Sequence, residues 1–317
     1  MTRWPWRSIR KIEPSRASGA SSYSVLSVSR MSTPERVPGS YDLITPCTGG
    51  DATGVGEFAA IERIRRLFPS PPPGQAWIGD DAAVLDDGLL LAVDTVVAGV
   101  HFGPGTPLAD VGWKALTVNV SDIAAMGGTP GHAVVAVAAP PDIDLDLIYE
   151  GMAEASSTYG CPVVGGDLAN ARELVVTVAV TGHVNGAPVL RSGARPGDGI
   201  YLTGPLGGAA ADGYRARAWA RVAEGRAARL AGATAMIDVS DGLVADLNHI
   251  AEASGVGYEL HDIPRAASAT EEQALHGGED FELVFTGIDL PVGIRIGTCT
   301  ADSSHRLPAR GWEHDFS

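Results

Sequence analysis

The feature that most constrains the fold of this chain is the alternation of helix-like and strand-like segments from about residue 55 onward. Residues 56–68 carry apolar side chains at helical spacing and end at a Pro- and Ser-rich stretch. Residues 89–97 and 173–182 are apolar, valine-rich and bounded by turn residues, which indicates strands. Further helices are expected at about 110–126, 144–159, 208–231 and 243–253, and further strands at 82–85, 132–140, 199–204 and 281–287. Interleaved strands and helices predict an α/β protein with mixed sheets and helices packed on them.

Charge and composition divide the chain into three parts. The first forty residues hold seven Lys or Arg against two Glu and show no sustained apolar period, so we expect a disordered N-terminal extension over residues 1–40. An organellar transit peptide, or a translation start at Met31, is an alternative interpretation of this segment. A Pro-Gly turn at 195–198 opens the second half. We predict an N-terminal α/β domain over residues 41–185 and a C-terminal α/β domain over residues 186–317.

The charge balance narrows the classes of partner. The 317 residues include 23 Lys and Arg against 38 Asp and Glu, a formal net charge of −15, which argues against nucleic acid and against an anionic membrane surface. No run of 18 apolar residues is present in the sequence, so no membrane span is expected. Cys47, Cys161 and Cys299 are far apart and form no CxxC pair. Reduced thiols and a cytoplasmic location are the expectation.

Acidic residues gather around a predicted β-hairpin. A turn centred on Asp87 would place Asp81 opposite Val93 and Asp80 opposite Asp94, so that three carboxylates lie at one open end. Like charges that face each other across strands are destabilising unless a cation offsets them. Oxygen ligands without His or Cys favour Mg²⁺. A solvated turn that carries unrelated acids is the alternative.

Two further acids lie where an aspartate is unexpected. Asp122 occupies the C-terminal half of an otherwise apolar helix, where its charge opposes the helix dipole. Asp167 follows two glycines at the end of a strand-like segment, which would allow close approach of a phosphate or a metal ion. A surface position for Asp122 and a simple turn at Asp167 are the alternatives.

A third group of polar residues belongs to the second half of the chain. Asp238 and Asp241 flank Ser240 directly before a predicted helix, where they could cap the helix or hold a metal-bound phosphate at its N-terminus. Arg191 lies beside a glycine turn and could bind a phosphate through two N–H groups, or could simply be a surface residue. The sequence contains no Walker-type phosphate loop, no protein-kinase catalytic loop and no HExxH motif. Any nucleotide site is therefore of an unusual kind.

Seven segments taken together carry a specific resemblance. In chain order they read GDDAAVL, VDTVVAGVHF, KALTVNVSDIAAMGGTP, VVGGD, RSGARPGD, MIDVSDGLVADL and GGEDFEL. This series resembles the thiamine-monophosphate kinase family of the aminoimidazole ribonucleotide synthetase-like superfamily, over residues 56 to about 316. The resemblance implies the two-domain α/β fold of that superfamily and the ATP-dependent phosphorylation of thiamine phosphate to thiamine diphosphate. It also implies a homodimer, with the nucleotide between the two halves of each chain.

The resemblance also implies roles for individual residues. The implied ligands of several Mg²⁺ ions are Asp81, Asp94, Asp122, Asp167, Asp238 and Asp241. The implied nucleotide contacts are Gly166, Asp167, Arg191, Ser240 and Tyr149, and the implied contacts to thiamine phosphate are His101, Glu279 and Trp312. Without the resemblance, Tyr149 and Trp312 would be read as packing residues and His101 as a loop histidine. Because thiamine phosphate itself supplies the nucleophilic oxygen, positioning and charge neutralisation suffice for an in-line transfer and no strong base is expected.

Departures from the family pattern leave alternatives open. Ala92 and Val93 stand where the family usually has a Ser or Thr, and residues 215–221 read RARAWAR in place of a Pro-rich segment. The C-terminal domain is shortened, which bears on substrate affinity more than on metal binding. One alternative function is that of another ATP-dependent synthetase of the same superfamily. Another is that of a nucleotide-binding homologue with impaired catalysis.

Overall fold

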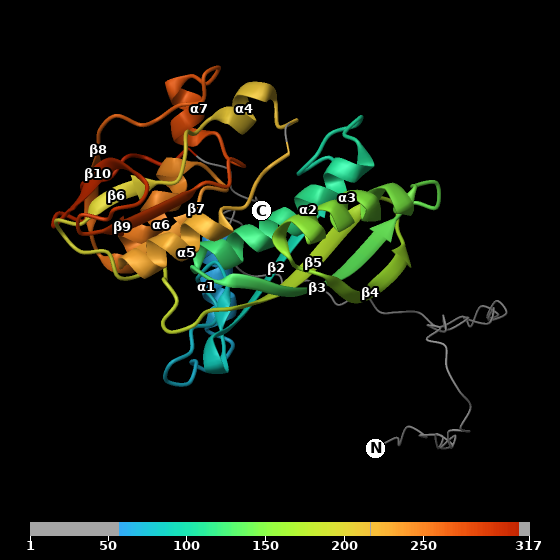
Figure 1. Ribbon diagram of the computed structural model, residues 1–317, viewed down its shortest axis with the longest axis horizontal. Helices are drawn as coiled ribbons and strands as arrows, with labels where there is room; N and C mark the ends of the chain where they lie inside the picture. Colours follow the sequence, from blue (N-terminus) through green and yellow to red (C-terminus); the bar gives the residue numbers. More distant parts are fainter. Residues whose placement is uncertain (1–56, 216, 311–317) are drawn as a thin grey trace, which may run out of the picture. The chain divides into compact units, whose positions relative to one another are not determined.

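The computed structural model describes residues 57–215 and 217–310 (Figure 1). The extension expected over residues 1–40 and the predicted site residue Trp312 lie outside the described residues. Two five-stranded sheets and their helices make up the described part, which confirms the expected α/β class. Among the helices within residues 57–215 and 217–310, none has the length and hydropathy of a membrane span.

The first sheet has the strand order β1-β2-β5-β3-β4. Its strands are β1 (Ala83–Val84), β2 (Leu89–Val97), β3 (Thr129–Ala139), β4 (Val163–Asn170) and β5 (Val175–His183). All neighbouring strands are antiparallel except β3 and β4, which are parallel and are connected through the helix α3 (Leu145–Tyr159). Figure 1 shows α3 and the long helix α2 (Leu108–Ala125) lying over one face of this sheet. The short helices α1 (Glu57–Arg65) and η1 (Asp86–Gly88) precede and join the first strands.

The hairpin register agrees with the sequence only in part. Ala83 pairs with Leu91, the alignment predicted for a turn centred on Asp87. The paired part of β1 begins at Ala83, however, so the expected pairs of Asp81 with Val93 and of Asp80 with Asp94 do not form. On its other edge, β2 pairs along its whole length with β5.

One face of the first sheet is buried and the other is open. Leu90, Val135 and Val178 point toward α2 and α3 and are at most 1% exposed. The two helices approach each other closely because Gly112 and Gly151 have no side chain: a Cβ at either position would lie less than 2 Å from a backbone oxygen of the other helix. This contact fixes α2 along the sheet and thereby fixes the direction of its polar residues.

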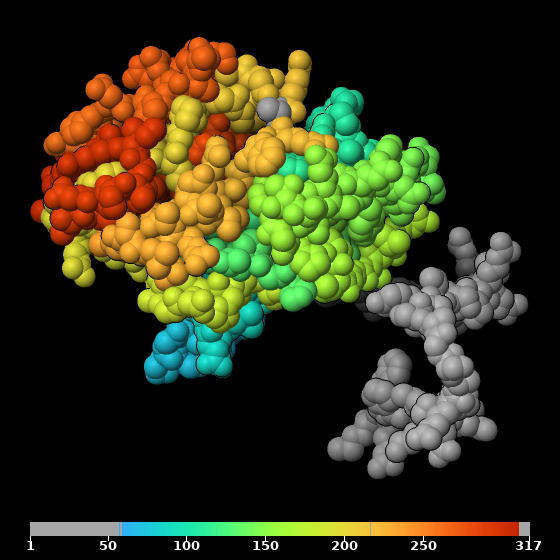
Figure 2. Space-filling model, in the orientation of Figure 1, coloured from blue at the N-terminus to red at the C-terminus, as the bar shows by residue number. Residues whose placement is uncertain are grey.

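The second sheet is antiparallel throughout, with the order β7-β9-β6-β10-β8. Its strands are β6 (Gly199–Leu202), β7 (Ala235–Asp238), β8 (Gly257–Leu260), β9 (Leu283–Gly287) and β10 (Ile294–Thr300), and its helices are α4 (Gly208–Asp212), α5 (Val222–Ala231), α6 (Leu243–Ser254) and α7 (Glu271–His276). The last turn of α2 packs with α5 and this sheet in one apolar cluster that includes Ala124, Ala228 and Phe285. In the space-filling view the gold surface around α5 lies between the green first half and the red second half (Figure 2).

Two sequence expectations about elements are corrected. The single helix expected over about 208–231 is two helices, because Gly213 adopts a left-handed conformation that ends α4 and the described residues 213–215 and 217–221 are not helical. Asp167 lies in the middle of β4 and not at a strand end, since the strand continues to Asn170. The predicted division at 185–186 falls between β5 and β6.

Candidate active site

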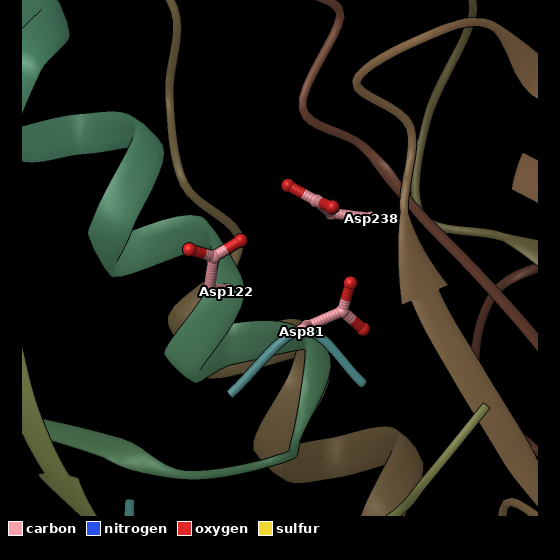
Figure 3. Close-up of side chains that lie close together, drawn as sticks. All are labelled: Asp81, Asp122 and Asp238. Carbon is pink, nitrogen blue, oxygen red and sulfur yellow. The ribbon is translucent and has the colours of Figure 1, made fainter. Parts of the chain in front are cut away.

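Three aspartates from separate segments meet in one place. Asp81 precedes β1, Asp122 lies near the end of α2, and Asp238 is the last residue of β7. Each offers a carboxylate oxygen, and these three atoms lie within 4.8 Å of one another. Figure 3 shows the three carboxylates around a common space. Asp81 and Asp122 belong to the half of the chain that forms the first sheet, and Asp238 belongs to the second sheet. Both halves must therefore fold for the acid cluster to form.

The acid cluster carries unfavourable negative charge. Burial, followed by the charges of Asp94 and Asp238, raises the pKa of Asp122 well above its usual value. Burial and the charge of Asp81 raise the pKa of Asp238 to about 8. The side chain of Asp81 is 1% exposed, and its Oδ2 has no hydrogen-bond partner. Buried polar atoms are rarely left without a partner, so this oxygen indicates room for a ligand.

Arg191 is the cation that contacts this cluster. Its guanidinium donates to Asp81 Oδ1 over 2.6 Å, and its backbone N–H donates to Asp80 Oδ2 over 3.1 Å. Its side chain is 21% exposed, so the surface-residue alternative for Arg191 does not describe its position. Burial and the charge of Asp81 nevertheless raise the pKa of Asp80 to about 7, which means that the guanidinium does not offset all of the negative charge.

A hard divalent cation fits this arrangement. The donor set consists of carboxylate oxygens, the ligands that Mg²⁺ prefers, and it includes the unpartnered Oδ2 of Asp81. Ser121 Oγ donates to Asp238 Oδ2 over 2.6 Å and so fixes the direction of that carboxylate. Asp94 is close enough to raise the pKa values of Asp122 and Asp238, although it is not one of the three closest acids.

The turn between β7 and α6 carries Ser240 and Asp241. Helix α6 begins after Gly242, which serves as its N-cap without any side-chain cap, so neither Ser240 nor Asp241 has the capping role considered as an alternative. The backbone N–H groups of Asp241 and Gly242 instead donate to Asp246 Oδ2 over 3.2 and 3.1 Å. Asp246 is not among the site residues that the sequence motifs predict. Its signal is an aspartate on the buried face of an otherwise apolar helical turn.

A second polar group lies along the same cavity. Lys114 Nζ donates to Glu279 Oε1 over 2.6 Å and to the carbonyl oxygen of His101 over 2.7 Å. His101 Nδ1 accepts from the N–H of Val97 over 3.1 Å. Lys114, His101 and Glu279 line the same open cavity of about 1950 Å³ as the acid cluster. Lys114 is likewise not among the predicted site residues, and its signal in the sequence is its position two helical turns before Asp122 on the same helix.

Three predicted site residues lie elsewhere. Tyr149, Gly166 and Asp167 line a separate shallow depression of about 510 Å³. The strand register explains the separation: Asp94 and Gly166 occupy one cross-strand row, three strands apart, which is roughly 14 Å. Asp167 pairs with Ala136, so its side chain points to the opposite face of the sheet from that of Asp94. A single chain therefore does not bring Asp167 into the cavity of the acid cluster.

Comparison with known proteins defines first a class and then a family. Residues 79–184 match the family model described as AIR synthase related protein, N-terminal domain. The chain is 38% identical to the thiamine-monophosphate kinase of Mycobacterium tuberculosis over 304 residues, which cover 82% of this chain and 89% of the relative. It is 39% identical to that of Bacillus subtilis over 270 residues, which cover 73% and 83%. Among solved structures, AaThiL complexed with AMPPCP and TMP superposes with a TM-score of 0.73 at 31% identity, over 82% of this chain and 97% of that chain. The chain belongs to the thiamine-monophosphate kinase family, as the seven motifs indicate.

Proposed function

We propose that this chain phosphorylates thiamine phosphate to thiamine diphosphate with ATP as the phosphoryl donor. Family membership and the ligands of the related structure, AMPPCP and TMP, support the choice of substrates. The observation that carries the proposal is the joining of two groups in one cavity: the acid cluster of Asp81, Asp122 and Asp238 at one end, and His101 with Glu279 at the other. Such a cavity can hold a polyphosphate beside a cationic organic substrate.

We assign the acid cluster to Mg²⁺. Asp81, Asp122 and Asp238 would hold one ion directly, and Asp94 and Asp241 border the same space and are available to further ions. When bound, the cations would neutralise charge on the phosphates. The same ions would remove the mutual repulsion that raises the pKa values of these carboxylates.

The chain's own groups then act by position and charge. Arg191 lies at the acid cluster, where we assign it and Ser240 to the phosphates of the nucleotide. The backbone carbonyl oxygen of Ser240 accepts a hydrogen bond from the N–H of Glu279 over 2.8 Å, which connects the nucleotide end of the cavity to the substrate end. Since the acceptor phosphate of thiamine phosphate supplies its own nucleophilic oxygen, no side chain has to act as a strong base.

We further propose a homodimer formed through the open face of the first sheet. This face exposes apolar side chains at alternate positions, namely Leu89, Leu91, Val93 and Val134, of which Val93 is 62% exposed. An apolar sheet face of this kind is typical of a surface that another chain covers. Asp167 points to the same face. In such a dimer, Asp167 of one copy would be available to the nucleotide of the other, which accounts for its distance from the acid cluster within one chain. Gly166 and Tyr149 line the same depression as Asp167.

Two further proposals concern the domain division and the location in the cell. We propose that the two sheets are the cores of two domains that divide at residues 185–186. We also propose a cytoplasmic location, where ATP is available and where free thiols such as the buried Cys161 and Cys299 stay reduced.

The test is a coupled measurement of ADP release by the purified chain with ATP, Mg²⁺ and thiamine phosphate. We expect ADP release that requires thiamine phosphate, with thiamine diphosphate as the product, and little release with unphosphorylated thiamine. Nucleotide binding without ADP release would instead support the impaired homologue. ADP release that does not depend on thiamine phosphate would support the function of another synthetase of the superfamily.

A further inference from the structure

Helix α2 forms one wall of the cavity along its whole length. Lys114, Val118 and Asp122 all line the cavity and follow one another at intervals of four residues, so they share one side of the helix. With a rise of 1.5 Å per residue, the backbone positions of Lys114 and Asp122 are about 12 Å apart along the helix axis. The helix therefore places an ammonium group at one end of the cavity and a member of the acid cluster at the other.

Lys114 joins two loops that are far apart in the sequence. Its Nζ binds the carbonyl oxygen of His101, which follows β2, and the carboxylate of Glu279, which precedes β9. The side chains of Lys114 and Glu279 are 17% and 28% exposed, so both are partly shielded from solvent. An ammonium group has three N–H donors, and these two acceptors engage two of them.

Glu279 needs such support to keep its place. Its φ of +64° lies in the left-handed region, which is unfavourable for residues other than glycine and persists where neighbouring contacts hold it. The hydrogen bond from its N–H to Ser240 fixes the backbone, and Lys114 fixes the carboxylate. Acidic side chains outnumber basic ones in the lining of the cavity, so a carboxylate without this cation would be repelled from its present position.

We propose that Lys114 is a positioning residue that holds Glu279 and the His101 loop in the arrangement that receives the cationic ring of thiamine phosphate. This inference rests on the proposed function, because it assigns Glu279 and His101 to that substrate. Lys114 acts through Glu279: it sets where the carboxylate meets the thiazolium ring and so fixes how far the acceptor phosphate lies from the acid cluster. Loss of Lys114 affects the substrate end of the cavity and leaves the nucleotide end in place.

The test compares Lys114→Met, which removes the charge, with Lys114→Arg, which keeps it. For Lys114→Met we expect the KM for thiamine phosphate to rise about tenfold, while the KM for ATP stays within about twofold of the wild-type value. Lys114→Arg should recover most of this loss. The double variant Lys114→Met/Glu279→Gln should lose less affinity for thiamine phosphate than the two single variants added together, since Lys114 acts in part through Glu279.

Arg229→Met is the matched control, because Arg229 is a partly buried cation that donates to the backbone carbonyls of Gly127 and Asn185 outside the cavity. It should lower the melting temperature without separating the two KM values. An equal rise of both KM values in Lys114→Met, no recovery by Lys114→Arg, or additive effects in the double variant would each overturn the role of Lys114. Wild-type protein that releases no ADP with thiamine phosphate would overturn the proposed function itself, and with it the substrate named here.

Discussion

At the scale of single residues, the carboxylates of Asp81, Asp122 and Asp238 are withdrawn from water into a shared space. Burial is the first cause of the raised pKa of each of the three, and the charges of neighbouring acids raise the pKa values of Asp122 and Asp238 further. Arg191 contributes the opposing charge through its contact with Asp81. The acid cluster is therefore under repulsion without a bound cation, and any cation that binds the folded form stabilises it by mass action.

Asp122→Asn and Arg191→Ala change this balance in opposite directions. Asp122→Asn removes one repelling charge, so we expect an unchanged or slightly higher melting temperature in the absence of metal. The rate of phosphoryl transfer should fall at least about a hundredfold, since a proposed metal ligand is lost.

Arg191→Ala leaves Asp81 buried without its cation, a change that typically costs about 3 kcal/mol or more. We expect its melting temperature to fall by roughly 6 to 12 °C.

Calorimetry and the ADP-release assay measure both variants. Asp142→Asn changes an exposed aspartate outside the cavity and should alter neither quantity. If Asp122→Asn kept more than about a tenth of the wild-type rate, a loss of less than ~1.4 kcal/mol in transition-state stabilisation, the assignment of Asp122 as a metal ligand would have to be given up.

At the scale of elements, the turn before α6 depends on a residue inside that helix. Asp246 is 1% exposed, and its Oδ2 accepts the N–H groups of Asp241 and Gly242. Burial, followed by the charges of Asp241 and Asp238, raises its pKa well above the usual value. Asp246 thus replaces an N-cap side chain from within the first helical turn and holds the segment that carries Ser240 and Asp241.

Asp246→Ala should leave two backbone N–H groups without their acceptor and release this turn. A loss of about 1 to 3 kcal/mol is expected, which corresponds to a fall of roughly 2 to 12 °C in the melting temperature, together with a higher KM for ATP. Asp246→Asn keeps an acceptor oxygen and should recover most of both losses. Thermal melts and ATP saturation curves provide the measurements. Equal damage by Asn and Ala would show that the hydrogen bonds to the turn are not what Asp246 contributes.

Local patterns predicted the elements well where one segment decides its own structure. The helix that became α2 and the register at Ala83 both follow from spacing within a single stretch of chain. The two-helix structure over 208–231 was missed, because an Ala- and Arg-rich composition favours helix throughout and the left-handed turn at Gly213 gives only a weak signal.

Only part of the candidate site could be predicted from the sequence, because several of its contacts join segments that are far apart in the chain. Motifs located Asp122 and Asp238, but the contacts of Lys114 with Glu279 and of Asp246 with its turn depend on tertiary packing. The direction of Asp167 could not be deduced at all from its own segment. It depends on the pairing of β4 with β3, and a shift of one residue would reverse the face to which Asp167 points.

At the scale of the whole molecule, the buried acids predict how stability depends on pH. The pKa values of Asp80 and Asp238 are raised to about 7 and about 8, whereas an unfolded chain titrates these groups near their usual value of roughly 4. The folded protein therefore binds more protons than the unfolded chain up to about pH 8, and its free energy of unfolding decreases as pH rises through that window. Below about pH 6.5, His249 acts in the opposite direction, because burial lowers its pKa to about 4.

We expect the melting temperature of the metal-free protein to fall by several degrees between pH 6.5 and pH 8.5. Asp238→Asn should reduce this decrease, since it removes one of the titrating groups. Mg²⁺ with ATP should reduce it as well, because a bound cation favours the charged carboxylates. Calorimetry at a series of pH values provides the measurement. A melting temperature that is constant or rises across this range would contradict the buried-charge description of the acid cluster.

The position of α2 restricts how the molecule can move. Its first turns pack with α3 and the first sheet, and its last turn packs in the apolar cluster of α5 and the second sheet. Because α2 is packed in the apolar clusters of both halves, it resists bending, and we expect little rotation of one half relative to the other. We therefore expect entry and exit of substrates to depend on the loops around the rim of the cavity, such as residues 99–107, more than on a hinge opening of the two halves. Cross-linking the two halves beside α2 would leave turnover intact, whereas restraining a rim loop would slow it.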